Sequence, residues 1–260
     1  MVQRPIIIAG PCSAETDEQM DIAFREAGSR GVDFVRVNLW KPRDIPAFDG
    51  LKEKGLYLLT RAAQAGVNPG LEVMFPDHVS MAMDAVLPHL KPEGKLLVWI
   101  GARNQNHFLQ REIARVASQD PRVMLMVKNQ PWPNDKHWEG IISHVLDVGF
   151  PKERLLNCYR GIAPSPSDHN PEEFRNIVDF ESAMSMKQKT GVPMIFDPSH
   201  TGGSVPNVFR MGEMSAEYDF DGIIIEIHHD PEHALTDSKQ QLTWQQFDEL
   251  MEKMHIAPKQ

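Results

Sequence analysis

The sequence predicts an α/β protein that folds as a single (β/α)8 barrel of the TIM type. The first observation is the composition, because a chain of 260 residues with 41% hydrophobic and 24% charged residues is typical of a folded globular protein. The second is a strand-sized apolar run that recurs at a mean spacing of about 31 residues, the size of a βαβ unit. The third is that a segment with helical periodicity follows each run.

Eight apolar, β-branched runs are the predicted strands, with starts near residues 6, 34, 71, 96, 123, 155, 193 and 222. Helices are expected over residues 17–31, 55–66, 78–90, 106–119, 135–149, 172–191 and 207–219, with a closing helix over 244–254. In 135–149, for example, Trp138, Ile141 and Val145 lie on one face and Gly149 ends the helix. Eight equal units favour a closed barrel over an open doubly wound sheet.

The chain is expected to form one domain, a catalytic barrel over residues 1–260. No linker, low-complexity tract or charge block divides it. The first strand begins by residue 6 and six residues follow Met254, so we expect no regulatory domain within this chain.

The charge balance and the apolar segments exclude several classes of protein. With 27 basic and 36 acidic residues the net charge is −9, which argues against general binding to nucleic acid or anionic membranes. No apolar run approaches the roughly 20 residues that span a bilayer, and the start lacks a secretory apolar region. Only two cysteines are present, so a disulfide framework is not indicated. We therefore expect a cytoplasmic protein.

Ionisable side chains gather where the predicted strands end. In a barrel of this kind the carboxyl ends of the strands carry the chemistry, since the interior is filled with packed side chains. The residues at these ends are Cys12, Arg36, Lys41, Glu72, Arg103, Lys128, Arg160, Asp197, His200 and Glu226, with Asp237 in the loop after the last strand.

A metal site is one candidate at this end of the barrel. Glu226 interrupts an apolar strand and shares a face with Ile224 and His228, so it is expected to point into the barrel mouth. A buried carboxylate there requires a cation or a proton. The candidate donors are Cys12, His200, Glu226 and Asp237, a set that suits Zn, Fe, Mn or Co. Taken singly, the Cys, His and Asp each have a structural explanation, as core residue, loop residue and helix cap.

The second candidate is an anion site. Its cations are Arg36, Lys41, Arg43, Arg103, Lys128 and Arg160. In an acidic protein this clustering at one end is no by-product of composition, and phosphates and carboxylates are the natural partners of such groups. Six cations indicate more than one anionic group on the ligands.

These residues lie in short motifs that keep their order along the chain. The motifs are GPCS (10–13), KPR (41–43), IGARN (100–104), MVKN (126–129), RGI (160–162), DPSH (197–200) and IEIHHDPEHALTD (225–237). Together they resemble type I 3-deoxy-D-arabino-heptulosonate 7-phosphate (DAHP) synthase, of the subgroup close to 3-deoxy-manno-octulosonate 8-phosphate synthase. The match runs from about residue 5 to residue 243.

The resemblance implies a transferase that condenses phosphoenolpyruvate with erythrose 4-phosphate and releases phosphate, the first step of the shikimate pathway to aromatic amino acids. It implies one divalent ion (Mn, Fe, Zn or Co) on the four donors named above. By position, the phosphoenolpyruvate contacts are Arg36, Lys41, Arg103, Lys128 and Arg160, and the aldose contacts are Lys41, Pro42 and Arg43. Cys12, Lys41 and His200 are the candidate catalytic residues. Lys41 is a candidate proton donor to the developing alkoxide, although a metal-bound water could serve instead.

Two other functions remain open. One is the octulosonate synthase, which uses arabinose 5-phosphate. KPR favours the heptulosonate enzyme, because the sister family typically has Ala-Asn-Arg after the lysine. The other is a non-catalytic barrel that partners another enzyme, which the presence of all four metal donors disfavours. The chain departs from the family at Asp44 and Ile45, where Thr and Ser are usual. We also expect that the protein forms a homo-oligomer. A chorismate mutase or regulatory module is expected to be fused to it or associated with it in the full-length protein.

Overall fold

The computed structural model describes residues 4–42, 46–165 and 174–257. Arg43, which the motif KPR predicts to contact the aldose, lies outside the described residues. So do Asp44 and Ile45, where the sequence departs from the family pattern.

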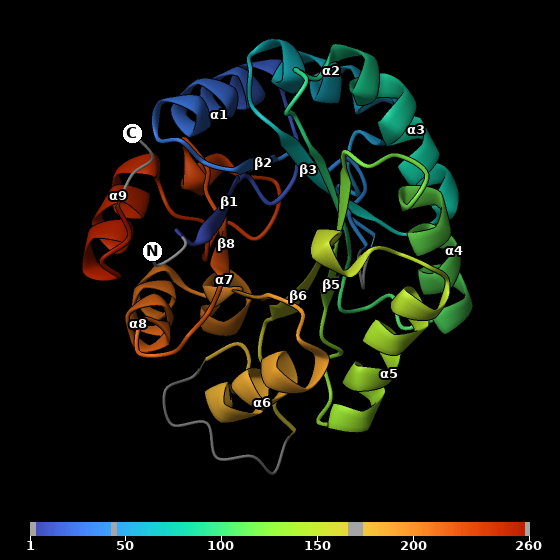
Figure 1. Cartoon of the computed structure of the whole chain (residues 1–260). Helices are drawn as coiled ribbons and strands as arrows, with labels where there is room; N and C mark the ends of the chain where they lie inside the picture. Colours follow the sequence, from blue (N-terminus) through green and yellow to red (C-terminus); the bar gives the residue numbers. More distant parts are fainter. Residues whose placement is uncertain (1–3, 43–45, 166–173, 258–260) are drawn as a thin grey trace.

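Eight parallel strands close into a barrel in chain order (Figure 1). β8 returns to β1 with Ile6 opposite Gly222 and Gly10 opposite Glu226, which closes the sheet. The strands are β1 (Ile6–Gly10), β2 (Phe34–Arg36), β3 (Pro69–Val73), β4 (Leu96–Ile100), β5 (Val123–Lys128), β6 (Leu155–Tyr159), β7 (Met194–Phe196) and β8 (Gly222–Glu226). The predicted fold class is confirmed.

Helices surround the barrel (Figure 1). They are α1 (Asp17–Ser29), α2 (Tyr57–Gln64), α3 (Pro76–Val86), α4 (His107–Ala117), α5 (Asp135–Asp147), α6 (Phe180–Thr190), α7 (Pro198–Gly202), α8 (Val205–Ser215) and α9 (Trp244–Lys253). Short 3-10 turns cover Lys52–Gly55, Leu87–His89, Lys152–Arg154 and Pro231–His233. Within the part of the chain that is described, no helix combines the length and the apolar character that crossing a membrane requires.

Two elements after β6 differ from the prediction. The helix expected over 172–191 begins only at Phe180, because the side chain of Asp179 accepts the N–H of Ser182 at 2.9 Å and caps it there. Residues 174–179 are not helical, and Ile177 instead forms an antiparallel bridge with Ile162. The helix α7 was not predicted, because five residues are too few to show a helical period.

The inside of the barrel is a packed apolar layer. It consists of Ile8, Phe34, Leu97, Trp99, Met126, Leu156, Cys158, Ile195 and Ile224. Neighbouring residues of the strands, such as Ile223 and Ile225, belong instead to the larger cluster between the strands and the helices. This alternation confirms that Ile224 and Glu226 share the inner face of β8. Since the interior is filled, the polar site must lie above it, at the carboxyl ends of the strands.

Candidate active site

A cavity of about 200 Å³ opens at the carboxyl ends of the strands. It is lined by Lys41, Pro42, Glu72, Gly101, Ala102, Arg103, Lys128, Arg160, Arg175, His200 and Asp237. Seven of these are predicted site residues. These lining residues lie in, or in the loops after, seven different strands, β2 to β8, so the closed barrel brings together residues that are far apart in sequence.

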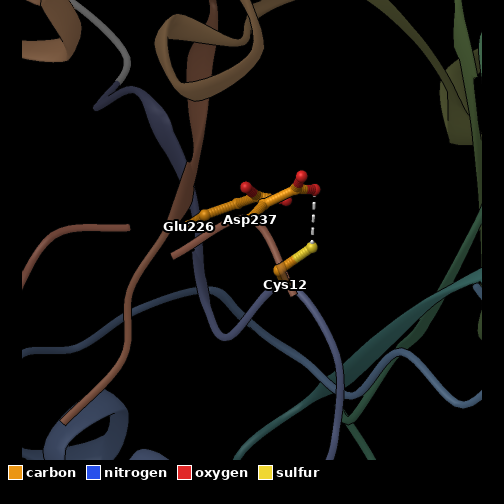
Figure 2. A group of neighbouring side chains, drawn as sticks. All are labelled: Cys12, Glu226 and Asp237. Atoms are coloured by element: carbon orange, nitrogen blue, oxygen red, sulfur yellow. Dashed lines mark hydrogen bonds between the residues drawn. The ribbon is translucent and has the colours of Figure 1, made fainter. Parts of the chain in front are cut away.

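A thiol and two carboxylates lie together beside the cavity (Figure 2). The sulfur of Cys12 and one carboxylate oxygen each of Glu226 and Asp237 are within 4.8 Å of one another. The Cys12 sulfur is 3.2 Å from Oδ2 of Asp237. The fourth predicted donor is adjacent, with Nε2 of His200 3.7 Å from Oε1 of Glu226. Sulfur, imidazole and carboxylate donors in one place fit a divalent ion of the Zn, Fe, Mn or Co type.

His200 is held so that one ring nitrogen faces this donor group. Its Nδ1 lies 2.9 Å from Asp197, whose other oxygen accepts the backbone N–H of His200 at 3.0 Å. Nε2 therefore points towards Glu226, as in metal sites where a second carboxylate orients the ligating histidine. Burial lowers the pKa of His200 to about 4, against the opposing charges of Asp197 and Glu226. The imidazole is neutral at pH 7, the form that binds metals.

Cations pair with the same donors. Nζ of Lys41 is 2.6 Å from the Cys12 sulfur and 2.8 Å from Oδ2 of Asp237. Nη2 of Arg36 donates to Oε1 of Glu226 at 2.8 Å. Burial opposes a charge on Lys41, but its electrostatic interactions with Cys12, Glu226 and Asp237 outweigh burial and raise the pKa of Lys41. Lys41 is thus an ammonium group at neutral pH.

The pKa values of Glu226 and Cys12 shift in opposite directions. Burial would raise the pKa of Glu226, but the charged forms of His200, Arg36 and Lys41 outweigh it and hold that pKa at about 2. Burial raises the pKa of the Cys12 thiol, with a smaller contribution from Glu226. The carboxylates are therefore ready to bind a cation, whereas Cys12 must release a proton when it does so.

Three guanidinium groups, those of Arg103, Arg160 and Arg175, also line the cavity. Burial lowers the pKa of Arg160, and the charges of Arg175 and Arg103 lower it further against the attraction of Asp197. Its Nε is buried and has no hydrogen-bond partner among the described residues. Lys128, in contrast, is paired with Asp197 at 2.6 Å. A buried donor beside other cations favours binding of an anion.

The predicted contact Arg36 lies deeper than the cavity wall. It is 2% exposed, and its side chain donates to Glu226 and to the backbone oxygen of Pro11. Its role towards phosphoenolpyruvate stays a prediction.

Two residues of the site escaped the sequence analysis. Arg175 lines the cavity, and it was hidden because the sequence predicted a helix around it. Gln240 links Arg175 to Glu226, accepting from the first at 2.7 Å and donating to the second at 2.6 Å. A neutral glutamine outside the strands carries no signal of its own. Only its place shortly after Asp237 could have drawn attention to it.

Comparison with known proteins identifies the family. The sequence profile of the DAHP synthetase I family matches residues 2–259. The chain belongs to this family. It is also 31% identical over 250 residues to the phospho-2-dehydro-3-deoxyheptonate aldolase of Thermotoga maritima, which covers 95% of this chain and 68% of that protein. The predicted family is confirmed.

Solved structures of DAHP synthases share the fold. A crystal structure of the Thermotoga maritima enzyme superposes with a TM-score of 0.81 at 29% identity, over 96% of this chain and 68% of that one. A truncated form of the 3-deoxy-D-arabino-heptulosonate 7-phosphate synthase from the same organism gives 0.77 at 25% identity, covering 96% and 84%. A 2-dehydro-3-deoxyphosphooctonate aldolase of Desulfatibacillum aliphaticivorans is 26% identical over 272 residues, covering 96% and 90%. Both branches of the predicted resemblance thus occur among the relatives of this chain.

Proposed function

We propose that this DAHP synthetase I family member condenses phosphoenolpyruvate with erythrose 4-phosphate, releasing inorganic phosphate, and depends on a divalent metal ion. The observation that carries the proposal is the combination of two kinds of group at one cavity. Cys12, Glu226 and Asp237 gather metal donors, and Arg103, Arg160 and Arg175 bring positive charge to the same cavity. Family membership and the DAHP synthase relatives support the choice of reaction.

The cationic side chains that line the cavity would hold the enol substrate. Phosphoenolpyruvate carries a phosphate and a carboxylate, and Arg103, Lys128 and Arg160 line the cavity that would receive them. One cation about 4 Å from a phosphate charge gains roughly 4 kcal/mol at an effective dielectric near 20, before desolvation. Because Lys128 is already paired with Asp197, the buried and partly unpaired Arg160 is the strongest candidate among them. Such anchoring holds C3 of the enol near the aldehyde carbon.

Cys12, His200, Glu226 and Asp237 would hold the divalent ion. When bound, the ion acts as a Lewis acid on the aldehyde oxygen of the aldose. His200 is neutral and both carboxylates are ionised before the ion arrives, so only the Cys12 thiol has a proton to lose.

Lys41 would supply the proton of the first step. As C3 of phosphoenolpyruvate bonds to C1 of the aldose, the aldehyde oxygen becomes an alkoxide that needs a proton. Lys41 is protonated at neutral pH, lines the cavity and lies within 2.8 Å of Asp237 and Cys12. Water then adds at C2 and releases one proton, which replaces the proton given by Lys41. The bond from C2 to the phosphate oxygen breaks as C2 becomes the ketone, and the second proton of the water leaves with inorganic phosphate. The closed barrel supports the proposal that one catalytic domain carries out this reaction. We also propose that the protein forms a homo-oligomer, and only the resemblance to DAHP synthases supports that part.

The test is phosphate release from phosphoenolpyruvate with each aldose in turn, with and without a chelator. We expect faster release with erythrose 4-phosphate than with arabinose 5-phosphate. The chelator should abolish release, and Mn, Fe, Zn or Co should restore it. Turnover that survives exhaustive chelation would show that the metal part of the proposal is wrong.

The octulosonate synthase reaction is the second candidate function. The similarity to the 2-dehydro-3-deoxyphosphooctonate aldolase of Desulfatibacillum aliphaticivorans favours it, and the motif KPR over residues 41–43 opposes it. A preference for arabinose 5-phosphate in the same assay would replace the first function with this one.

A further inference from the structure

Two consecutive glutamines connect the proposed metal ligands to one another. We propose that Gln240 and Gln241 are positioning residues that hold Glu226 and Cys12 in place, and that they thereby set the affinity of the site for its metal ion. The inference rests on the metal site of the proposed function, but not on the identity of the aldose.

Gln240 holds the carboxylate of Glu226. It is 3% exposed, and its Nε2 donates to Oε2 of Glu226 at 2.6 Å. Its Oε1 accepts from Nη1 of Arg175 at 2.7 Å. The amide can have only this orientation, because an arginine only donates and an ionised carboxylate only accepts. Since Arg36 donates to the other oxygen at 2.8 Å, both oxygens of Glu226 are held and the group cannot rotate freely.

Gln241 holds the backbone of Cys12. It is completely buried, and its Oε1 accepts the backbone N–H of Cys12 at 3.0 Å. Its Nε2 donates to the backbone oxygen of Thr236 at 2.8 Å, directly before Asp237. On the other side, Asn38 donates to the backbone oxygen of Cys12 at 2.7 Å. Both backbone polar groups of Cys12 are therefore fixed, and the sulfur is directed towards Asp237.

The segment that carries the glutamines is itself fixed next to β8. The backbone N–H of Leu242 donates to the backbone oxygen of Glu226 at 2.9 Å, and Leu242 forms a parallel bridge with Ile227. The backbone N–H of Gln240 donates to the backbone oxygen of Asp237 at 3.2 Å, which closes a turn. Asp237 adopts a left-handed backbone conformation with φ of 44°, which aspartate tolerates better than most residues.

One short segment thus supplies a ligand and holds two others. Asp237 belongs to it, Glu226 is reached through Gln240, and Cys12 is reached through Gln241. Groups that hydrogen-bond to metal ligands typically change metal affinity by about 10- to 100-fold when they are removed. Gln240 and Gln241 are hydrogen-bonded in this way to Glu226 and Cys12, two ligands that come from opposite ends of the chain.

The experiment is a titration of chelator-stripped protein with Co²⁺, followed by the thiolate-to-cobalt absorption band and the visible bands of the bound ion. The variants are Gln240→Leu and Gln241→Leu, which keep the volume and remove the hydrogen bonds. We expect the Kd for Co²⁺ to rise about 10- to 100-fold in each. Gln241→Leu should also weaken the thiolate band, since it releases Cys12.

The matched control is Gln110→Leu. Gln110 is also completely buried and donates to the backbone oxygen of Asn104 at 2.8 Å, but it lies in α4, on the far side of the barrel from β8. We expect its Kd for Co²⁺ to stay within about twofold of the unmodified protein. Equal thermal stability of the three variants would separate a loss of metal affinity from a loss of fold.

The outcomes are distinguishable. If the unmodified protein binds Co²⁺ and both site variants bind as tightly as Gln110→Leu, the positioning role is wrong while the proposed function stands. If the unmodified protein does not bind Co²⁺, the metal site is wrong and the positioning role falls with it. Should Gln241→Leu fail to fold, Gln241→Glu keeps an acceptor for the N–H of Cys12. Because that hydrogen bond is kept, this variant should weaken Co²⁺ binding by less than tenfold, and a larger loss would contradict the proposal.

Discussion

The interior of the barrel and its mouth each contain a buried cysteine, in opposite chemical surroundings. Cys158 lies in the interior among aliphatic and aromatic side chains, and Cys12 lies at the mouth beside Lys41 and Asp237. Both cysteines are completely buried. Burial raises the pKa of both thiols, that of Cys158 to about 12. Burial alone therefore does not distinguish a structural thiol from a functional one. The charges of Lys128 and Asp197 also act on Cys158, so the distinguishing feature of Cys12 is the direct contact of its sulfur with Lys41 and Asp237.

The mouth satisfies its buried charges by pairing them. Glu226 is bound by Arg36, and Asp197 is bound by Lys128, all of them nearly inaccessible to solvent. Taking such groups from water costs several kcal/mol for each ion, so replacement by apolar residues often leaves a protein as stable or more so. The apolar interior has no such cost. We infer that changes at the mouth will affect activity more than stability, and that changes in the interior will do the reverse.

The largest expected effect is that of Cys12→Ala. Removing the thiol removes the only sulfur of the proposed donor set, so we expect metal-dependent turnover to fall by more than about 100-fold, beyond the usual effect of a supporting residue. The measurements are phosphate release and a thermal melt, and the melting temperature should change by only a few degrees. Full turnover in Cys12→Ala would show that Cys12, like Cys158, is not required for activity.

The second effect concerns acid stability at the mouth. Burial lowers the pKa of His200 from 6.5 to about 4, so between these values the unfolded chain binds a proton that the folded chain does not. The free energy of unfolding therefore falls as the pH drops through this window, by about 2 kcal/mol between pH 7 and pH 5 from this residue.

The measurement is urea unfolding of metal-free protein at the two pH values, for the unmodified chain and for His200→Asn. The variant should lose less stability on acidification, because asparagine does not titrate. Equal losses in the two proteins would show that His200 is not held neutral in the fold.

The smallest effect is expected in the interior. Cys158→Ala removes one buried sulfur from a packed apolar layer, so we expect a loss of about 1 kcal/mol in the free energy of unfolding. Turnover should remain within about twofold of the unmodified enzyme. Denaturant unfolding and phosphate release check the two statements, and a large fall in turnover would mean that the interior and the mouth do not act separately.

The sequence by itself determined the barrel and most of the residues around its cavity. Apolar runs and helical periods depend on neighbours along the chain, so they are readable without the fold. Capping signals are local in the same way, yet the helix after β6 was predicted too early because its apolar pattern extends past the cap at Asp179. Glu226 was predictable because a carboxylate within an isoleucine strand requires a special environment.

Only the tertiary structure decided how the donors are held. The contact from Gln241 to Cys12 exists because β8 closes against β1, which brings together residues 229 positions apart. The contact from Gln240 to Glu226 depends on the segment after β8 folding back beside that strand. Arg175 lines the cavity from residues 174–179, which are not helical and are held beside Ile162 by the bridge of Ile177. A neutral amide has no pattern in sequence, since its role depends on the two groups that the fold places at its ends.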